Sequence, residues 1–265
     1  MSAFNYCFST LGCSELSLRE TADLAQRHGI TNVELRALSG TVDLIQALAA
    51  EFGTPAKFAA FLTERGLRVA ALNTSMRLFG STDLSAVLPF IDWAEAAGIV
   101  YLRIFDGGKQ VGPAEMTQAS GLLDDWQALR QSRRLNVDLM IETHDALADL
   151  NQLLAFIECA PAAKILWDTH HTWAKGTDLK TLWHHAAKNI VHLHVKDSTT
   201  DSNGQRRYVL PGQGDFPIAD LLSLLQSDER QVPLSLEWER HWHPELPPLQ
   251  DALKAARSWW RQGAF

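Results

Sequence analysis

The sequence has little of what marks membrane, secreted or metal-finger proteins. No apolar run reaches the roughly 18 residues that a membrane span requires. The N-terminal stretch lacks a basic segment followed by an apolar one, which is the pattern of a signal peptide. The three cysteines, Cys7, Cys13 and Cys159, match no metal-finger spacing. We therefore expect no membrane association and a cytoplasmic protein with reduced thiols.

Positive charge is also scarce. The chain carries 24 Lys and Arg against 31 Asp and Glu, a formal net charge of −7. A nucleic-acid-binding protein normally shows an excess of basic residues on one face, so we expect no nucleic-acid partner. A small anionic substrate stays compatible with this composition, because a few local Arg or Lys residues are enough to bind it. The sequence leaves open whether the chain is a monomer or a homo-oligomer.

What the sequence does have is a regular alternation of β-rich runs and helical stretches. Gly29, Gly66 and Gly98 follow three of the helical stretches, where glycine commonly ends a helix. The predicted strands are residues 5–10, 31–36, 67–75, 100–105, 137–143, 163–168, 190–196 and 233–238. The predicted helices are residues 16–28, 55–65, 83–97, 113–134, 148–159, 179–188, 217–228 and 248–262.

This alternation predicts an α/β fold. Strands separated by helices favour a parallel sheet. Eight such units in 265 residues favour a closed (β/α)8 TIM barrel, which typically needs roughly 250 residues, and we expect one domain over residues 1–265. An open α/β sheet is the alternative, but no Gly-x-Gly-x-x-Gly follows the first predicted strand.

Ionisable residues stand at the ends of the last four predicted strands: Glu142, Asp168, His194 and Glu237. In a TIM barrel, the carboxyl ends of the strands form the active face. Three carboxylates meeting there without a cation would repel one another and raise their pKa values. We therefore predict that these four side chains bind one divalent metal ion.

The ligand types indicate which metals suit this site. Three oxygen donors and one imidazole suit Mn²⁺, Mg²⁺ or Co²⁺. Zn²⁺ also accepts histidine and carboxylate ligands, so it stays open.

The strand ends together resemble those of the xylose isomerase-like TIM barrels, a family of sugar isomerases, ketose 3-epimerases, inosose dehydratases and endonuclease IV proteins. The matching motifs are Ile-Glu142-x-His144, Asp168-x-x-His171, His192-x-His194-x-Lys196-Asp197 and Glu237-Trp238-Glu239. The resemblance covers essentially the whole chain. It implies that Glu142, Asp168, His194 and Glu237 are metal ligands and that His171 contacts a substrate hydroxyl.

The sequence departs from two branches of that family. Ketose 3-epimerases carry a second Glu after the fifth strand, where residues 146–150 offer only Asp149. Endonuclease IV proteins carry further histidine ligands on the third and fourth strands, but residues 73–75 and 103–105 contain none. The three-metal nuclease site is therefore incomplete.

The ligand set also suggests a chemistry. A metal held in this way has open positions at which an α-hydroxy ketone can chelate, so the metal would stabilise an enediolate. Glu142 and Glu237 could then act as acid and base. Returning the proton gives an isomerase or epimerase of a sugar or sugar phosphate, which is our leading expectation. Losing a hydroxyl instead gives a dehydratase of the inosose or dehydroshikimate type. An endonuclease IV-like nuclease and a non-catalytic sugar-binding barrel are the remaining alternatives.

Other residues near the predicted strand ends are candidates for substrate binding. They are Glu34, Arg36, Arg103, His144 and Lys196. For Glu34 and Arg36 a plain structural ion pair is an equal alternative. The loop at residues 210–216 contains Gly212 and Gly214, whose amides could approach a phosphate, or it could be a turn that leads into the next helix.

Overall fold

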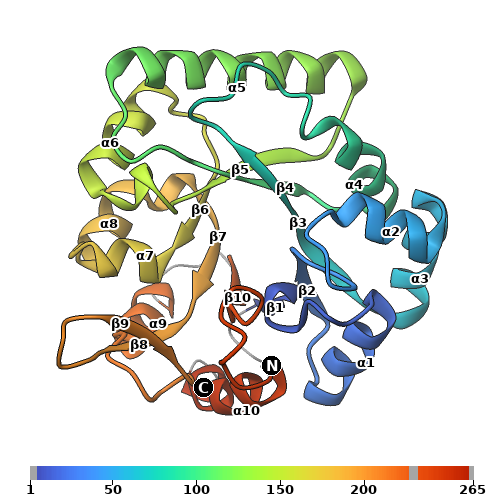
Figure 1. The fold of residues 1–265 in the computed structure, drawn as a ribbon. Coiled ribbons are helices and arrows are strands. Elements are labelled where there is room, and N and C mark those ends of the chain that lie inside the picture. Colours follow the sequence, from blue (N-terminus) through green and yellow to red (C-terminus); the bar gives the residue numbers. More distant parts are fainter. Residues whose placement is uncertain (1–4, 227–231, 263–265) are drawn as a thin grey trace.

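The computed structural model describes residues 5–226 and 232–262, and in it the parallel strands close into a barrel (Figure 1). The barrel strands are β1 (Asn5–Ser9), β2 (Asn32–Leu35), β3 (Arg68–Arg77), β4 (Tyr101–Phe105), β5 (Asp138–Glu142), β6 (Ile165–Asp168), β7 (Ile190–Val195) and β10 (Pro233–Leu236). Their order around the barrel is β1-β10-β7-β6-β5-β4-β3-β2. The predicted TIM barrel is confirmed.

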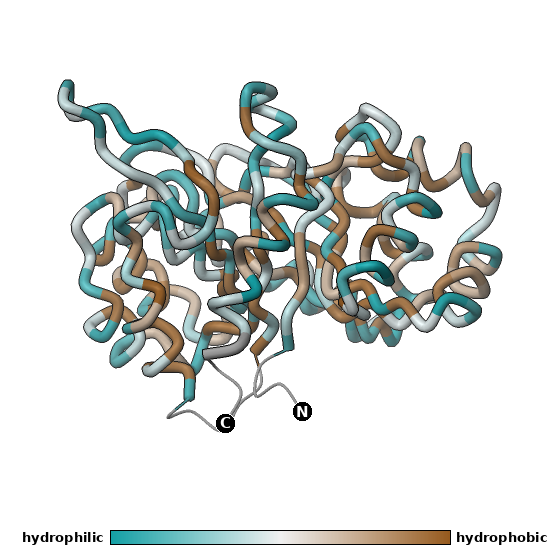
Figure 2. The backbone as a smooth tube through the Cα atoms, turned by 90° about the horizontal axis from the view of Figure 1, so that it is seen from below, coloured by the Kyte–Doolittle hydropathy of each residue, from teal (hydrophilic) through white to brown (hydrophobic). Residues whose placement is uncertain are grey.

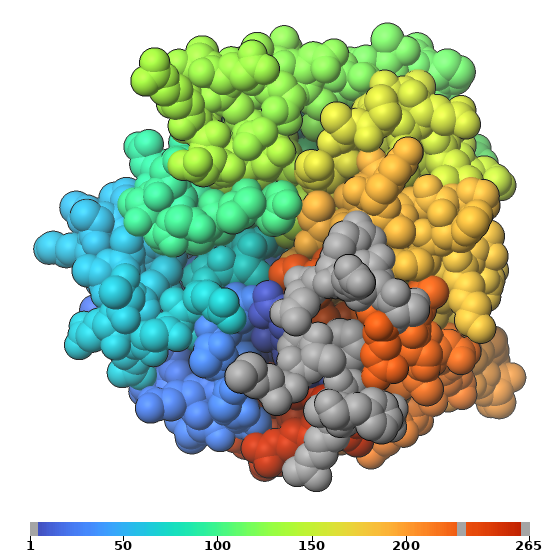
Figure 3. Space-filling view, turned by 180° about the vertical axis from the view of Figure 1, so that it is seen from behind, coloured from blue at the N-terminus to red at the C-terminus, as the bar shows by residue number. Residues whose placement is uncertain are grey.

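Helices cover the outside of the barrel (Figure 1). They are α1 (Leu18–His28), α2 (Leu44–Phe52), α3 (Pro55–Arg65), α4 (Ile91–Ala97), α5 (Pro113–Arg133), α6 (Leu150–Cys159), α7 (Thr169–Ala174), α8 (Leu179–Ala186), α9 (Ile218–Gln226) and α10 (Leu249–Gln262). Within the described residues the short 3₁₀ helices are η1 (Thr10–Cys13), η2 (Leu88–Phe90), η3 (Ala146–Ala148) and η4 (Ala187–Asn189). The N-terminal helix α1 packs beside the C-terminal helix α10, which closes the ring of helices around the barrel (Figure 3). No helix within the described ranges combines the length and hydropathy needed to cross a bilayer.

The helix ends follow local sequence. Ser17 and Glu20 form a reciprocal capping box at the start of α1, and Gly29 ends that helix in the left-handed conformation with a φ of 69°. Gly66 and Gly98 end α3 and α4 in the same conformation. Glycine adopts this conformation without steric cost, which is why these three boundaries could be predicted.

Several elements differ from the prediction. Helix α2 was not predicted, although Asp43 caps its first turn. The helix expected over residues 83–97 begins later, with η2 and then α4. Helix α7 follows β6 at once, with Asp168 as its N-cap. Of the helix expected over residues 217–228, the last two residues lie outside the described part of the chain.

The loop after β7 contains an unpredicted antiparallel hairpin of β8 (Asp197–Thr200) and β9 (Arg206–Val209). The hairpin forms a hydrophilic projection on the side away from both chain ends (Figure 2). Asp197 ties the following loop to it, because its carboxylate accepts hydrogen bonds from the amides of Gly212, Gly214 and Phe216 at 2.9, 3.0 and 3.2 Å. The amides that could have bound a phosphate therefore bind Asp197.

Gly214 leaves no room for a side chain in this loop. A Cβ there would collide with the Asp197 carboxylate and the Ser198 carbonyl. We expect Gly214→Ala to destabilise the protein by about 1–3 kcal/mol, the usual cost of overpacking, as measured by urea unfolding. Gly121→Ala in α5 is the matched control. Its Cβ would meet nothing within 4 Å, so it should stabilise the helix by about 0.5–1 kcal/mol. Equal stability of the two variants would contradict the prediction.

The barrel interior has an apolar layer beneath the polar strand ends. Ala71, Met140 and Leu166 form a small buried cluster separate from the main core. Met140 and Leu166 stand two residues before Glu142 and Asp168, so all four side chains point to the same, inner side of the barrel. This layer supports the polar residues above it.

Candidate metal centre and active site

Four polar side chains converge at the carboxyl ends of adjacent strands. They are Glu142 at the end of β5, Asp168 at the end of β6, His194 in β7 and Glu237 directly after β10. Each offers a ligand atom within 4.8 Å of the others, and all four are buried. These are the four residues that the sequence pattern predicts as metal ligands, and we call them the four-residue cluster. The structure places them together, and metal binding by them stays a prediction.

His194 presents one ring nitrogen to the three carboxylates. Its Nδ1 lies 3.3 Å from Glu237 Oε2, 3.4 Å from Glu142 Oε1 and 3.9 Å from Asp168 Oδ2. The same nitrogen is buried and makes no hydrogen bond. The other nitrogen, Nε2, lies 2.8 Å from Glu34 Oε1. An imidazole held through one nitrogen, with the second aimed at carboxylates, has the usual arrangement of a metal-ligating histidine.

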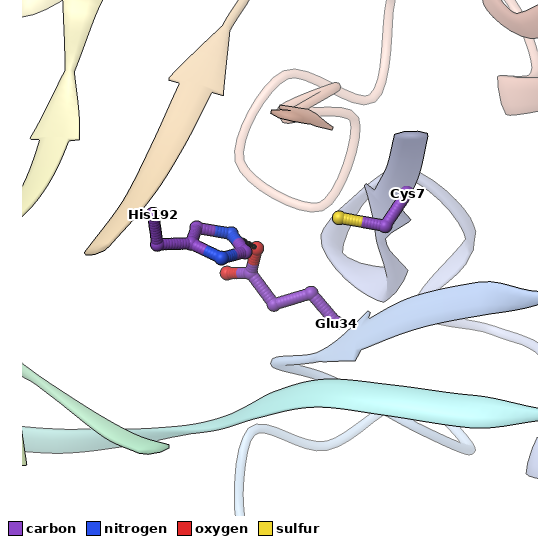
Figure 4. A group of neighbouring side chains, drawn as sticks. All are labelled: Cys7, Glu34 and His192. Carbon is purple, nitrogen blue, oxygen red and sulfur yellow. Dashed lines mark hydrogen bonds and ion pairs between the residues drawn. The ribbon is translucent and has the colours of Figure 1, made fainter. Parts of the chain in front are cut away.

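Glu34 lies inside the barrel, where it bridges two histidines. Its Oε2 is 2.8 Å from His192 Nε2, and Asn73 donates a second hydrogen bond to Oε1. Burial opposes ionisation of Glu34, but His194 and His192 outweigh it and hold the pKa of the carboxyl well below its usual range. Figure 4 shows the Glu34 carboxylate against the His192 ring, with the Cys7 thiol beside them. Both Glu34 oxygens thus contact imidazoles, and we propose a positioning role in place of a substrate contact.

Glutamine at position 34 tests that role. An amide offers one acceptor oxygen, so Glu34→Gln cannot accept from both imidazoles. We expect Mn²⁺ affinity to fall by about 10–100-fold, as is typical when a partner of a ligating histidine is lost, in a calorimetric titration. Glu51→Gln is the control, because Glu51 accepts from the amides of Leu18 and Arg19 far from the cluster. An unchanged Mn²⁺ affinity in Glu34→Gln would show that Glu34 is only structural.

Lys196 supplies positive charge beside the cluster. Its Nζ lies 2.8 Å from Asp168 Oδ2, 2.5 Å from Glu237 Oε2 and 2.6 Å from Glu239 Oε1. Burial lowers the pKa of this ammonium, but the carboxylates outweigh burial and raise the pKa well above its usual value. Lys196 is therefore a protonated side chain whose charge is already paired with carboxylates of the protein.

The charges fit a dication. Four carboxylates meet here, those of Glu142, Asp168, Glu237 and Glu239. The cations that touch them are Lys196 and Arg103, whose Nε lies 3.1 Å from Glu142 Oε2. Two negative charges are left among these groups. In the absence of a metal the adjacent imidazoles of His194 and His171 can offset them, because the carboxylates outweigh burial and raise both pKa values; with both imidazoles neutral, a dication would do so. The donor set of three oxygens and one nitrogen suits Mn²⁺, Mg²⁺, Co²⁺ or Zn²⁺.

His171 and His144 lie between the cluster and the mouth of the barrel. His171 Nε2 is 3.7 Å from Asp168 Oδ2 and 3.9 Å from Glu239 Oε1. Burial lowers its pKa, but the adjacent carboxylates more than offset this and raise it. The His144 ring stands 4.8 Å from the His171 ring, and 38% of its side chain is exposed. Both histidines are placed where a substrate could reach them.

Two further residues at the site did not emerge from the sequence as candidates. Glu239 accepts hydrogen bonds from Lys196 and from the Tyr208 hydroxyl, the latter at 2.9 Å. The spacing of Glu237 and Glu239 could have indicated Glu239. Tyr208 could not be found in the same way, because it enters from the unpredicted hairpin.

Arg36 and Arg103 lie on the β2–β4 side of the cluster. Arg103 ion-pairs with Glu142 and donates to the Thr74 carbonyl at 3.2 Å. Arg36 donates to the Ser75 hydroxyl at 3.3 Å. The ion pair between Glu34 and Arg36, one of the two alternatives that the sequence left open, does not form, because Glu34 faces the histidines.

The comparisons with known proteins agree with this architecture. The family model described as xylose isomerase-like TIM barrel matches residues 22–263. The chain belongs to the xylose isomerase-like TIM barrel family. No curated protein matches it significantly.

Several solved structures share the fold. The probable 3-DHS dehydratase of petrobactin synthesis from Bacillus anthracis has a TM-score of 0.73 and 18% identity, covering 96% of this chain and 99% of that one. A 3-keto-D-glucoside 4-epimerase from E. coli has a TM-score of 0.68 and 14% identity, covering 98% and 99%. A putative sugar phosphate isomerase/epimerase from Anabaena variabilis gives the same four values. At these identities the likeness establishes the family fold and leaves the chemistry to the site.

Proposed function

We propose that this family member is a metal-dependent enzyme that moves a proton next to the carbonyl of a small sugar or sugar-derived substrate, as isomerases and epimerases do. The observation that carries the proposal is the His194 Nδ1, which is buried without a hydrogen-bond partner and faces three carboxylates. Solved structures that share the fold include proteins described as a 3-keto-D-glucoside 4-epimerase and a putative sugar phosphate isomerase/epimerase, which supports the same chemistry.

The four-residue cluster would hold the metal. A bound dication would polarise the substrate carbonyl as a Lewis acid. Asp168 is fixed for this role because its Oδ1 accepts from the His171 amide at 2.8 Å, which orients Oδ2 toward the cluster. Glu34 and Asn73 fix the His194 ring from below.

The two glutamates of the cluster have different surroundings. Glu142 has Oε1 facing His194 and Oε2 bound to Arg103. Glu237 makes its contacts to Lys196 and His194 through Oε2 alone. We therefore propose that Glu237 takes the proton at Oε1, the oxygen that contacts neither Lys196 nor His194, and that Glu142 is the second acid–base group.

A dehydratase is the second candidate, favoured by the hydrogen-bonded proton donors next to Glu239. The Lys196 ammonium and the Tyr208 hydroxyl both donate to Glu239. Such a chain could deliver a proton to a leaving hydroxyl. The likeness to a probable 3-DHS dehydratase supports this alternative.

Incubation in deuterated water tests the proposal and separates the two outcomes. The Mn²⁺-loaded protein is mixed with ketopentoses, ketohexoses, their phosphates, a 3-keto-glucoside and 3-dehydroshikimate. We expect deuterium to enter one substrate beside its carbonyl without loss of water, as followed by NMR. A product lacking the elements of water would identify a dehydratase. The absence of both changes, with metal bound, would contradict the proposal.

A further inference from the structure

Arg36 is a buried cation that forms no direct ion pair among the residues that the structure describes. Its side chain follows β2 at the barrel mouth, and only 4% of the residue is exposed. Nη2 donates to the Ser75 hydroxyl, but Nη1 is buried without a hydrogen-bond partner. Within residues 5–226 and 232–262 the guanidinium forms no ion pair. Proteins rarely bury a charge in this way, because its lost hydration is not repaid.

The guanidinium stays protonated at neutral pH. Burial, and then the charge of Arg103, lower the pKa of Arg36 to about 10, and the carboxylates of Glu142 and Glu237, which form no direct ion pair with it, offset this only in part. That value is still well above neutral pH, so the Arg36 side chain keeps its positive charge although it forms no ion pair with a described residue. A partner from outside the protein would satisfy it.

Arg103 brings a second guanidinium to the same place. The two groups lie 3.9 Å and 5.9 Å from the centroid of the Phe105 ring, with Arg103 nearer. Contacts of Arg103 to Glu142 and Thr74 use Nε and Nη1. Two positive charges therefore lie side by side. Among the described residues, one carboxylate contacts them directly, that of Glu142 through Arg103.

We propose that Arg36 and Arg103 bind a carboxylate of the substrate beside the metal centre. The inference rests on the proposed function for the reaction at the neighbouring carbonyl and specifies the substrate class as a sugar-derived acid. Planar guanidinium groups match the two oxygens of a carboxylate. Arg103 also touches Glu142 of the cluster, so the bound anion lies close to the reacting carbonyl. A carboxylate bonded directly to the carbon skeleton meets that requirement, whereas a phosphate stands one ester oxygen further from the skeleton.

Lys196 does not compete for this role. Its ammonium already contacts three carboxylates within 2.8 Å. The free positive charge at the mouth is thus on the side of β2 and β4, and the expected carboxylate lies there.

Three probes that differ at one carbon test the inference: D-mannonate, D-mannitol and D-mannitol 1-phosphate. Each is titrated into the full-length protein with and without Mn²⁺. We expect mannonate to bind at least about tenfold more tightly than either of the others, in line with hydrogen bonds to charged groups. Tighter binding of the phosphate would overturn the carboxylate assignment, and equal or absent binding of all three would overturn the anion site.

The variant Arg36→Gln locates the effect. It should abolish the preference for mannonate and leave the Mn²⁺ affinity unchanged. It should also leave the melting temperature unchanged or raise it, because an unpaired buried charge is removed. Arg240→Gln is the control, since Arg240 pairs with Glu15 and its loss should leave the preference intact. A preference that survives in Arg36→Gln would mean that the metal alone binds the carboxylate, and would overturn the proposal. Failure of the wild type to bind Mn²⁺ would count against the proposed function instead, because the anion titrations without metal stand apart from it.

Discussion

Glutamine at position 237 is expected to lower kcat by at least about 100-fold with metal bound, because general acid–base groups typically contribute 10²–10⁴-fold. Glutamine keeps the size of the side chain and one oxygen donor, so metal binding persists in part. It removes the basic carboxylate that we propose takes the proton. The measurement is kcat at saturating Mn²⁺ on the substrate found by deuterium exchange.

Glu142→Gln should also cost at least about 100-fold in kcat, but with a different pattern. For an epimerase, each variant should slow proton removal from one epimer more than from the other, and isotope exchange measured separately from each epimer shows this. Glu245→Gln is the control, because this exposed residue pairs only with His243 among the described ion pairs.

Near-normal turnover by Glu237→Gln with metal bound would make Glu237 a ligand only. Lys196 would then be the first alternative proton carrier, since its Nζ is 2.5 Å from Glu237 Oε2. His144 would be the second, because 38% of its side chain is exposed at the mouth.

The second large effect concerns the metal itself. Mn²⁺ should raise the melting temperature of the wild-type protein, because a ligand that binds only the folded state stabilises it by about 2.7 kcal/mol at 100 times its Kd. In Asp168→Asn this stabilisation should be lost or strongly reduced. The amide oxygen can still accept from the His171 amide as the N-cap of α7, so the variant should fold.

Asp178→Asn is the matched control for that variant. Asp178 is likewise an N-cap, accepting from the Thr181 amide at 2.8 Å at the start of α8. Its variant makes the same chemical change away from the cluster and should keep the full response to Mn²⁺. A wild-type melting temperature that does not move with Mn²⁺, Co²⁺, Mg²⁺ or Zn²⁺ would contradict the metal prediction.

The position of the four-residue cluster could be predicted because it depends on local patterns. Each of the four side chains follows or ends an apolar β run, and parallel strands deliver their carboxyl ends to one face. The barrel order places β5, β6, β7 and β10 next to one another, as consecutive β/α units require. The unpredicted hairpin between β7 and β10 does not disturb this order, because it projects out of the barrel.

The roles of Glu34 and Arg36 could not be read in the same way. They stand two residues apart on one side of β2, and the sequence left open both an ion pair between them and contact with substrate. In the structure Glu34 lies inside the barrel against His192 and His194, more than 150 residues away in the chain. Arg36, one step nearer the mouth, donates to the Ser75 hydroxyl but forms no ion pair with any described residue. Closure of the barrel decides this, because it sets the depth at which each side chain lies.

The sequence by itself determined the barrel, its strand ends and the residues of the candidate metal centre, because strand alternation and helix termination are properties of short segments. Only the tertiary structure decided which charges are compensated. Lys196, Glu239 and Tyr208 meet through a hairpin and a loop from different units, and Arg36 and Arg103 come together from β2 and β4. Electrostatic energy depends on distances across the fold and on burial, and neither is encoded in the spacing of residues along the chain.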